Sequence, residues 1–154
     1  MFAEQMNKKG VTLIELVVVL VIIAIMAGLL APNIGAWLPN YRLRSATRDI
    51  VSTMRTAQMK AVSNNIQYRV NLDDAEIGVK GYVLQYQTTG GNWVSDGAVQ
   101  SLPTGISISA NTLPGKHAAF NPNSTSSAGS VTLISTKGTK TITVSPATGR
   151  VRIE

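Results

Sequence analysis

The amino-acid sequence predicts an α+β protein, in which a long amino-terminal helix, first transmembrane and then amphipathic, packs on an antiparallel β-sheet domain. A continuous apolar run comes first, and beyond it small or apolar residues recur at spacings of three and four. The remainder alternates apolar with polar residues between groups of turn-forming residues. A helix followed by a series of strands is typical of the α+β class.

The apolar run reads VTLIELVVVLVIIAIMAGLLA and directly follows two lysines. Between Glu15 and Arg42 there is no charged residue, so the segment 11–40 meets the requirement of about 20 residues for a helix that crosses a bilayer. The lysines orient the amino-terminal end toward the cytoplasm by the positive-inside rule. We therefore expect a single membrane anchor at 11–40, with the domain at 41–154 on the far side.

An amphipathic helix is predicted beyond the anchor. Its apolar stripe needs a sheet to cover it and consists of Leu43, Ala46, Ile50, Met54, Ala57 and Ala61. Arg44, Arg48 and Arg55 share another face, about 130° away at about 100° per residue. The pair Asn64 and Asn65 is predicted to end this helix.

Short strands are predicted after the helix because apolar residues alternate with polar ones there. The predicted strands lie at 66–72, 82–86, 93–94, 106–108, 131–134, 142–144 and 151–153. The segment 121–130, NPNSTSSAGS, is rich in Ser, Gly and Asn and is predicted to be a loop between strands.

Length and composition limit what the domain can be. The chain has 154 residues, so the part beyond the anchor suits one small domain. It has no cysteine, which excludes disulfides and thiolate metal sites. The formal net charge of +6 is compatible with acidic surfaces or nucleic acid as partners.

The residues Lys8-Lys9-Gly10 followed by VTLIE resemble the prepilin signal of type IV pilins and type II secretion pseudopilins. The stretches RLRSATRDIVSTMRTAQMKAVSNN, FNPNSTSSAGSVTL and TGRVRIE resemble minor pseudopilins of the GspH/FimT type. The resemblance implies a type IV pilin-like fold and a leader peptide at 1–10. It also implies a single-pass protein of the bacterial inner membrane, with its carboxy-terminal domain in the periplasm, that joins a filament after assembly.

The resemblance also assigns roles to three residues. It implies that prepilin peptidase cuts after Gly10, that the new amino terminus at Val11 is methylated, and that Glu15 is needed for assembly with other pilins or pseudopilins. The family usually has Phe after the cut, where this chain has Val11. Either Met1 or Met6 is compatible with the start of the leader, since Met6 gives the compact leader MNKKG.

Physical reasoning agrees with an assembly role for Glu15. Cleavage leaves an amine on Val11 and a carboxylate on Glu15, in apolar surroundings where unpaired charges are costly. A neighbouring helix that is shifted along the axis can place its own Glu15 beside that amine, and repetition of this stagger generates a filament. The alternative is a plain anchor with Glu15 at the level of the lipid headgroups.

No pattern of catalytic residues stands out, so we expect neither an enzyme nor a cofactor or metal. The one histidine, His117, has no cysteine or carboxylate near it in sequence and is interpreted as structural. The acidic residues Asp73, Asp74 and Glu76 lack the spacing of an EF-hand loop and are predicted to form a solvated turn.

The carboxy-terminal sequence Gly149-Arg150-Val151-Arg152-Ile153 predicts a strand with Val151 and Ile153 on its packed face and both arginines in solvent. The two guanidinium groups would then stand about 7 Å apart, near the spacing of successive nucleic-acid phosphates. An edge strand protected by charge is the plainer alternative. A Gly-Arg-x-Arg ending also resembles that of FimT-like minor pilins implicated in DNA uptake.

Two classes of function therefore remain open. The first is a minor pilin or pseudopilin of a type IV pilus or a type II secretion pseudopilus. The alternative is a DNA-binding minor pilin that acts in DNA uptake during natural transformation, with Arg150 and Arg152 as the DNA contacts. Because Arg44, Arg48 and Arg55 lie on the helix, we expect them to provide an internal control for the terminal pair. The sequence does not distinguish the two machines.

Overall fold

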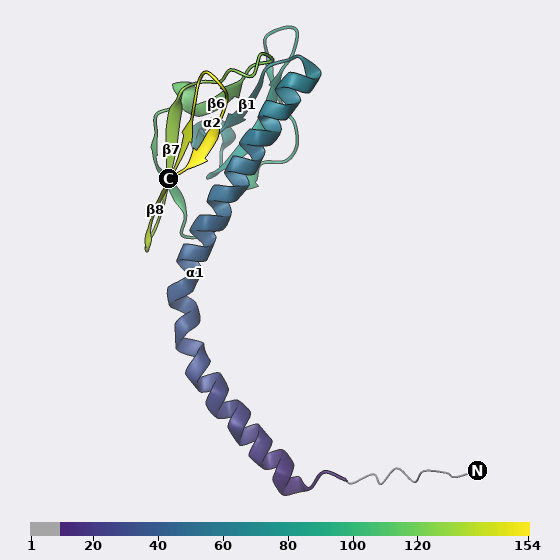
Figure 1. Cartoon of the computed structure of the whole chain (residues 1–154), viewed down its shortest axis with the longest axis vertical. Helices are drawn as coiled ribbons and strands as arrows, with labels where there is room; N and C mark the ends of the chain where they lie inside the picture. Colours follow the sequence, from purple (N-terminus) through teal and green to yellow (C-terminus); the bar gives the residue numbers. More distant parts are fainter. Residues whose placement is uncertain (1–9) are drawn as a thin grey trace, which may run out of the picture. The chain divides into compact units, whose positions relative to one another are not determined.

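The computed structural model describes residues 10–154, and the side chains of these residues except 29–34 and 36. The predicted leader lies outside the described residues apart from Gly10. Helix α1 (Leu13–Asn64) is followed by short strands, as Figure 1 shows. The chain divides into two compact units, Met1–Trp37 and Leu38–Glu154, which are described separately.

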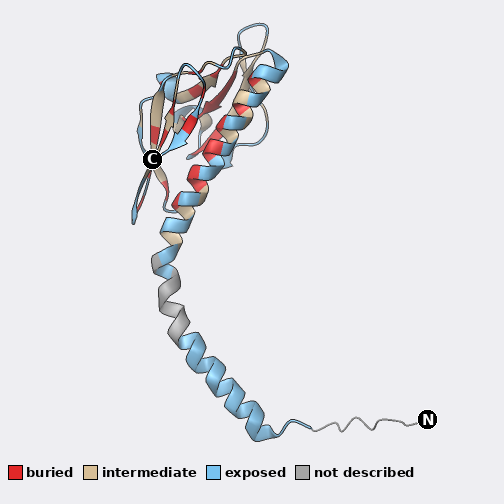
Figure 2. Ribbon diagram, viewed as in Figure 1, coloured by how far each residue is buried: buried red, intermediate tan, exposed pale blue. Residues whose placement is uncertain are grey.

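In the first unit, every residue whose burial is described is exposed, from Gly10 through the first turns of α1 (Figure 2). The exposed fractions of the large apolar residues there range from 42% at Val17 to 81% at Leu13. The sequence predicts a membrane crossing at 11–40. Within the described residues, no helical stretch combines the length and the apolar character that a crossing requires.

The second unit contains two antiparallel sheets rather than one. The first has the strand order β3-β2-β1-β6, with β4 paired to β2. Its strands are β1 (Tyr68–Asn71), β2 (Gly81–Gln87), β3 (Trp93–Ser95), β4 (Gln100–Ser101) and β6 (His117–Phe120). Tyr68 lies opposite Tyr86 of β2 and Phe120 of β6, so β1 is central in this sheet.

The second sheet has the order β5-β7-β8-β9, which places the carboxy-terminal strand at an edge. Its strands are β5 (Ser107–Asn111), β7 (Gly129–Ser135), β8 (Gly138–Val144) and β9 (Val151–Ile153). Strand β9 pairs only with β8 among the described residues, and Arg152 lies opposite Thr143. The strand predicted at 151–153 is thereby confirmed, and its edge position agrees with the plainer alternative for the two arginines.

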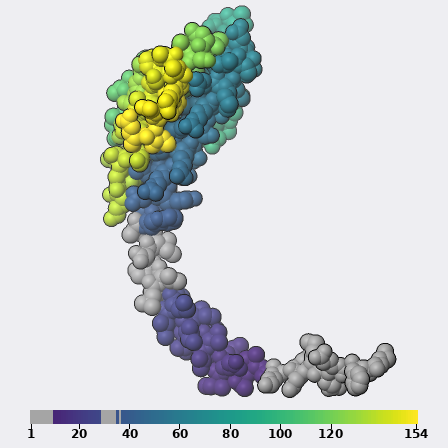
Figure 3. All heavy atoms as spheres, viewed as in Figure 1, coloured from purple at the N-terminus to yellow at the C-terminus, as the bar shows by residue number. Residues whose placement is uncertain are grey.

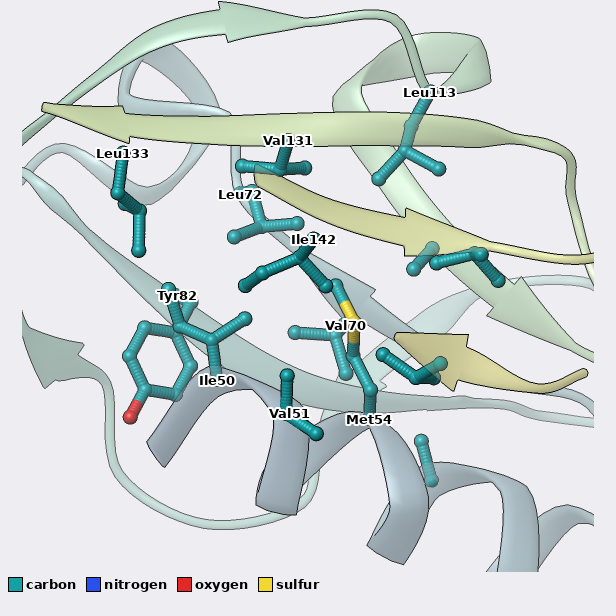
Figure 4. Packing of buried hydrophobic residues seen from close by; sticks show 14 of the residues in the cluster. Ile50, Val51, Met54, Val70, Leu72, Tyr82, Leu113, Val131, Leu133 and Ile142 are labelled. Carbon is teal, nitrogen blue, oxygen red and sulfur yellow. The ribbon is translucent and has the colours of Figure 1, made fainter. Parts of the chain in front are cut away.

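The core lies between α1 and both sheets. All six residues of the predicted helix stripe are buried, with exposed fractions of 3% or less. Figure 4 shows Ile50 and Met54 pointing from α1 toward Val70 of β1 and Ile142 of β8. The stripe is therefore covered by β-structure, as its periodicity predicts, and the strands that cover it come from both sheets.

Several short elements differ from the sequence prediction. The acidic segment predicted as a turn contains a one-turn helix, α2 (Asp74–Ile77), because the Asp73 side chain accepts a hydrogen bond from the amide of Ala75 and caps it. A 3-10 turn, η1 (Pro114–Lys116), precedes β6, and the sequence does not predict β6 itself. Its sequence HAAF contains too few β-branched residues to stand out from a loop.

Candidate functional site

At the amino-terminal site, Gly10 and Val11 are exposed and precede α1, so the peptide bond between them lies outside the helix. Thr12 caps the helix, because its hydroxyl oxygen accepts a hydrogen bond from the Glu15 amide at 3.3 Å. Thr12 and Glu15 have the spacing of a capping box, a signal in the sequence that could have identified Thr12 beforehand.

Glu15 lies in the first turn of α1 and is exposed. A carboxylate there interacts favourably with the helix dipole, typically by about 0.3–1 kcal/mol. Among the described residues it takes part in no ion pair, since the three salt bridges are Lys60–Asp96, Arg69–Glu76 and Lys116–Asp73. The helix start thus explains why a carboxylate is favourable at this position. The charge of Glu15 is still available to a cation of another molecule.

The carboxy-terminal site depends on how the turn before β9 is held. Gly149 is buried and has φ +62°, in the left-handed region that favours glycine. A Cβ there would come within 2.9 Å of the Ser124 carbonyl oxygen and closer still to the Gln58 side chain. Gln58 of α1 also donates a hydrogen bond to the Thr148 carbonyl at 2.9 Å. The turn is therefore fixed directly against the helix.

A cleft of about 770 Å³ lies between α1 and β9. Its lining residues are Arg55, Gln58 and Met59 of α1, and residues 150–154 at the end of the chain. Figure 3 shows the carboxy-terminal residues, in yellow, lying against the blue surface of the helix. Arg55 therefore belongs to the same cleft as Arg150 and Arg152, and it is not the independent control that its place on the helix suggested.

A second, smaller cleft of about 250 Å³ continues along the same side of the helix. It is lined by Arg44, Thr47 and Arg48 of α1, with Lys140 of β8 and Ile153 of β9. Ile153 lines both clefts and is 43% exposed, whereas Val151 is only 7% exposed. The prediction that both apolar residues of β9 are packed is thus right for Val151 and wrong for Ile153.

The three acidic residues after β1 have structural partners. The Lys116 ammonium lies 3.0 Å from Asp73 and lowers the pKa of that carboxyl below its usual value. Asp74 accepts a hydrogen bond from the Gly81 amide, and Glu76 pairs with Arg69 at 2.7 Å. These contacts link α2 and its cap to η1, β1 and β2, so each acidic residue has a structural partner.

His117 is the first residue of β6. Its Nδ1 lies 2.9 Å from the Gly115 carbonyl oxygen within the preceding turn. Among the described residues, no group of three or more His, Cys, Asp or Glu side chains could hold a metal ion.

Comparison with known proteins gives two family matches. Residues 5–31 match the prokaryotic N-terminal methylation motif, and residues 46–148 match the family of the type II transport protein GspH. The second match ends before Arg150 and Arg152. The chain is also 31% identical over 99 residues to the type II secretion system core protein G of Pectobacterium carotovorum subsp. carotovorum. That alignment covers 63% of this chain and 60% of the relative, so the chain spans about three fifths of its length.

Solved structures of minor pseudopilins and minor pilins share the fold. The minor pseudopilin EpsH of the Vibrio cholerae type 2 secretion system superposes with a TM-score of 0.61 at 10% identity, covering 73% of this chain and 96% of EpsH. The type IV minor pilin FimU of Pseudomonas aeruginosa gives 0.58 at 17% identity, covering 75% and 90%. The family match over 46–148, which spans most of the folded unit, shows that the chain belongs to the family of the type II transport protein GspH.

Proposed function

We propose that this chain is a precursor that prepilin peptidase cuts between Gly10 and Val11, and that then assembles into a type IV pilus or a type II secretion pseudopilus. The methylation motif at residues 5–31 supports the processing step. The scissile bond lies in exposed, non-helical chain ahead of α1, where a peptidase could reach it. The segment 11–40 would serve as the inner-membrane anchor until assembly.

The observation that carries the proposal is the exposed apolar surface of the first unit. The large apolar side chains described in this unit, which include Leu13 and Met26, are each at least 42% exposed. Such a surface in water marks a site of contact with lipid or with other subunits. Glu15 is the one charged residue among the described side chains of this unit, so it is the natural partner for the amine of a neighbouring subunit.

Processing is tested by mass spectrometry of the protein recovered with filaments. The expected chain begins at Val11 and carries one additional methyl group. Recovery of a filament-associated chain that still contains Lys8 and Lys9 would contradict the proposal.

Assembly is tested with two variants of Glu15. Glu15→Gln keeps a side chain that suits a capping box but removes the charge, whereas Glu15→Ala removes both. If Glu15 pairs with the amine of a neighbour, both variants should insert and be cleaved normally, and both should be lost from filaments. If Glu15 only starts the helix, Glu15→Gln should be incorporated like the wild type, and this result would refute the pairing.

DNA binding through Arg150 and Arg152 is the second candidate function. The observation that favours it is the cleft that joins this pair to Arg55, with none of the three in an ion pair among the described residues. Full-length protein in a non-ionic detergent should bind duplex DNA of any sequence, with an affinity that falls steeply with salt. Substitution of both terminal arginines by Gln should flatten the log-log salt slope by up to about 1.8 units. Binding that does not respond to salt would exclude phosphate contacts.

A further inference from the structure

Three arginines of α1 face the carboxy-terminal strand. Arg44, Arg48 and Arg55 lie within about 40° of one another around the helix axis, at about 100° per residue. Arg55 lines the larger cleft, and Arg44 and Arg48 line the smaller one. Because Ile153 lines both clefts, the two are neighbours along one side of α1.

The opposite wall of these clefts also carries cations. Arg150 and Arg152 lie in β9, or just before it, and Lys140 lies in β8. Three cations from the helix and three from β8 and the segment 150–152 thus line the clefts, and among the described residues the only acidic lining residue is Glu154. None of the six cations forms an ion pair within the described part of the chain.

We propose that α1 supplies half of a two-walled phosphate-binding track, whose occupant is the backbone of duplex DNA lying along the seam between α1 and β9. The proposal rests on the DNA-binding candidate function and extends it from the terminal pair to the helix. Six unpaired cations facing one acid create a positive potential along the clefts, and a polyanion that lies between or over them would be attracted to it and would relieve their mutual repulsion.

The length of the helix wall fits such a ligand. Arg44 and Arg55 are eleven positions apart, which spans about 16 Å along a helix. At about 3.4 Å per phosphate along one strand, this length corresponds to about five phosphates. The wall is therefore long enough for a run of backbone contacts rather than for one isolated phosphate.

The lining favours duplex over single-stranded DNA. Proteins that prefer single strands stack the bases on aromatic side chains, and no Phe, Tyr or Trp of the described chain lines either cleft. Phosphate contacts alone favour the form with the higher charge density, about one charge per 1.7 Å in the duplex. Duplex DNA should therefore bind more tightly than a single strand of equal length.

Three double variants of the full-length protein test the inference, and each removes two positive charges. Arg48→Gln with Arg55→Gln alters the helix wall, and Arg150→Gln with Arg152→Gln alters the strand wall. Lys80→Gln with Lys137→Gln is the control, because neither lysine lines these clefts and, like the cleft cations, neither forms an ion pair among the described residues. Binding of a labelled duplex is measured over a range of salt concentrations, and circular dichroism verifies that each variant is folded.

Each wall variant should flatten the log-log salt slope by up to about 1.8 units, and the control should leave it unchanged. If only the strand-wall variant flattens the slope, the helix wall is refuted and DNA binding through the terminal pair stands. If the wild type binds no duplex at low salt, both proposals are refuted. Both are also refuted if it binds vesicles of anionic lipid but no duplex DNA. Tighter binding of the single strand would overturn the duplex assignment.

Discussion

At the scale of single residues, Gly149 determines where the terminal arginines lie. Its positive φ and its contact with Gln58 and Ser124 leave no room for a side chain. The turn can therefore lie against α1 only because this residue lacks a Cβ. Arg150 follows directly, so the position of the charge depends on the glycine before it.

Gly149→Ala should lower the free energy of unfolding by about 1–3 kcal/mol, since alanine would be strained both by its backbone and by its neighbours. Gly105→Ala is the control, because Gly105 has φ +86° but a Cβ added there would meet no atom within 4 Å, so only the backbone strain applies. Urea denaturation of both variants measures the difference. Equal losses would show that the contact with Ser124 and Gln58 does not constrain the turn.

At the scale of elements, the buried stripe of α1 holds the two sheets together. Met54 is fully buried and Met59 is 64% exposed, although both lie on the same helix. Met54→Ala should cost about 2–5 kcal/mol of stability through lost burial and a residual cavity, whereas Met59→Ala should cost little. Thermal or urea unfolding measures both, and similar losses would contradict the position of the core.

The link between α2 and η1 should make stability depend on acidity. Lys116 holds the pKa of Asp73 below its ordinary value of 3.8, so the ionised form is favoured in the folded state. The stabilisation is then complete above that value and is lost as the pH falls through the folded-state pKa. Asp73→Asn should therefore be less stable than the wild type at neutral pH, with the difference shrinking in acid. Asn caps a helix about as well as Asp, so a difference that persists at the lowest pH would contradict the charge as its cause.

The elements also show what the sequence can and cannot predict. The stripe from Leu43 to Ala61 was predictable because helical periodicity is a local property. The clefts were not, because Arg55 and Arg150 are brought together only when β9 docks on α1. The alternation of apolar and polar residues correctly placed Val151 and Ile153 on one face of the strand. It could not reveal that Ile153 borders the cleft and is therefore partly exposed.

At the scale of the whole molecule, the two units differ in how they can be stable. All the buried residues of the described chain lie between Leu43 and Val151, within the second unit, and the described residues of the first are exposed. Residues 38–154 alone should therefore unfold with the same midpoint as the full chain in detergent. Calorimetry measures both, and a markedly lower midpoint for the shorter chain would show that the first unit stabilises the second.

The first unit also marks a limit of prediction at this scale. Its apolar run and its single carboxylate are plain in the sequence, yet what they contact depends on molecules other than this chain. The fold class, by contrast, was predictable. The apolar stripe of the helix and the apolar faces of the strands must both be buried, and packing the helix on the strands buries both. The division into two sheets was not, since strand order depends on distant pairings.

The contact between Arg69 and Trp93 gives the domain an internal fluorescence probe. The Arg69 guanidinium lies 4.3 Å from the centre of the Trp93 ring and also contacts Glu76 and Gln85, so the indole is held under a fixed positive charge. Trp37, the other tryptophan, is 65% exposed in the first unit. In a Trp37→Phe protein, the fluorescence of Trp93 would follow the first sheet alone, so the emission spectrum could record the loss of this sheet separately from events around α1.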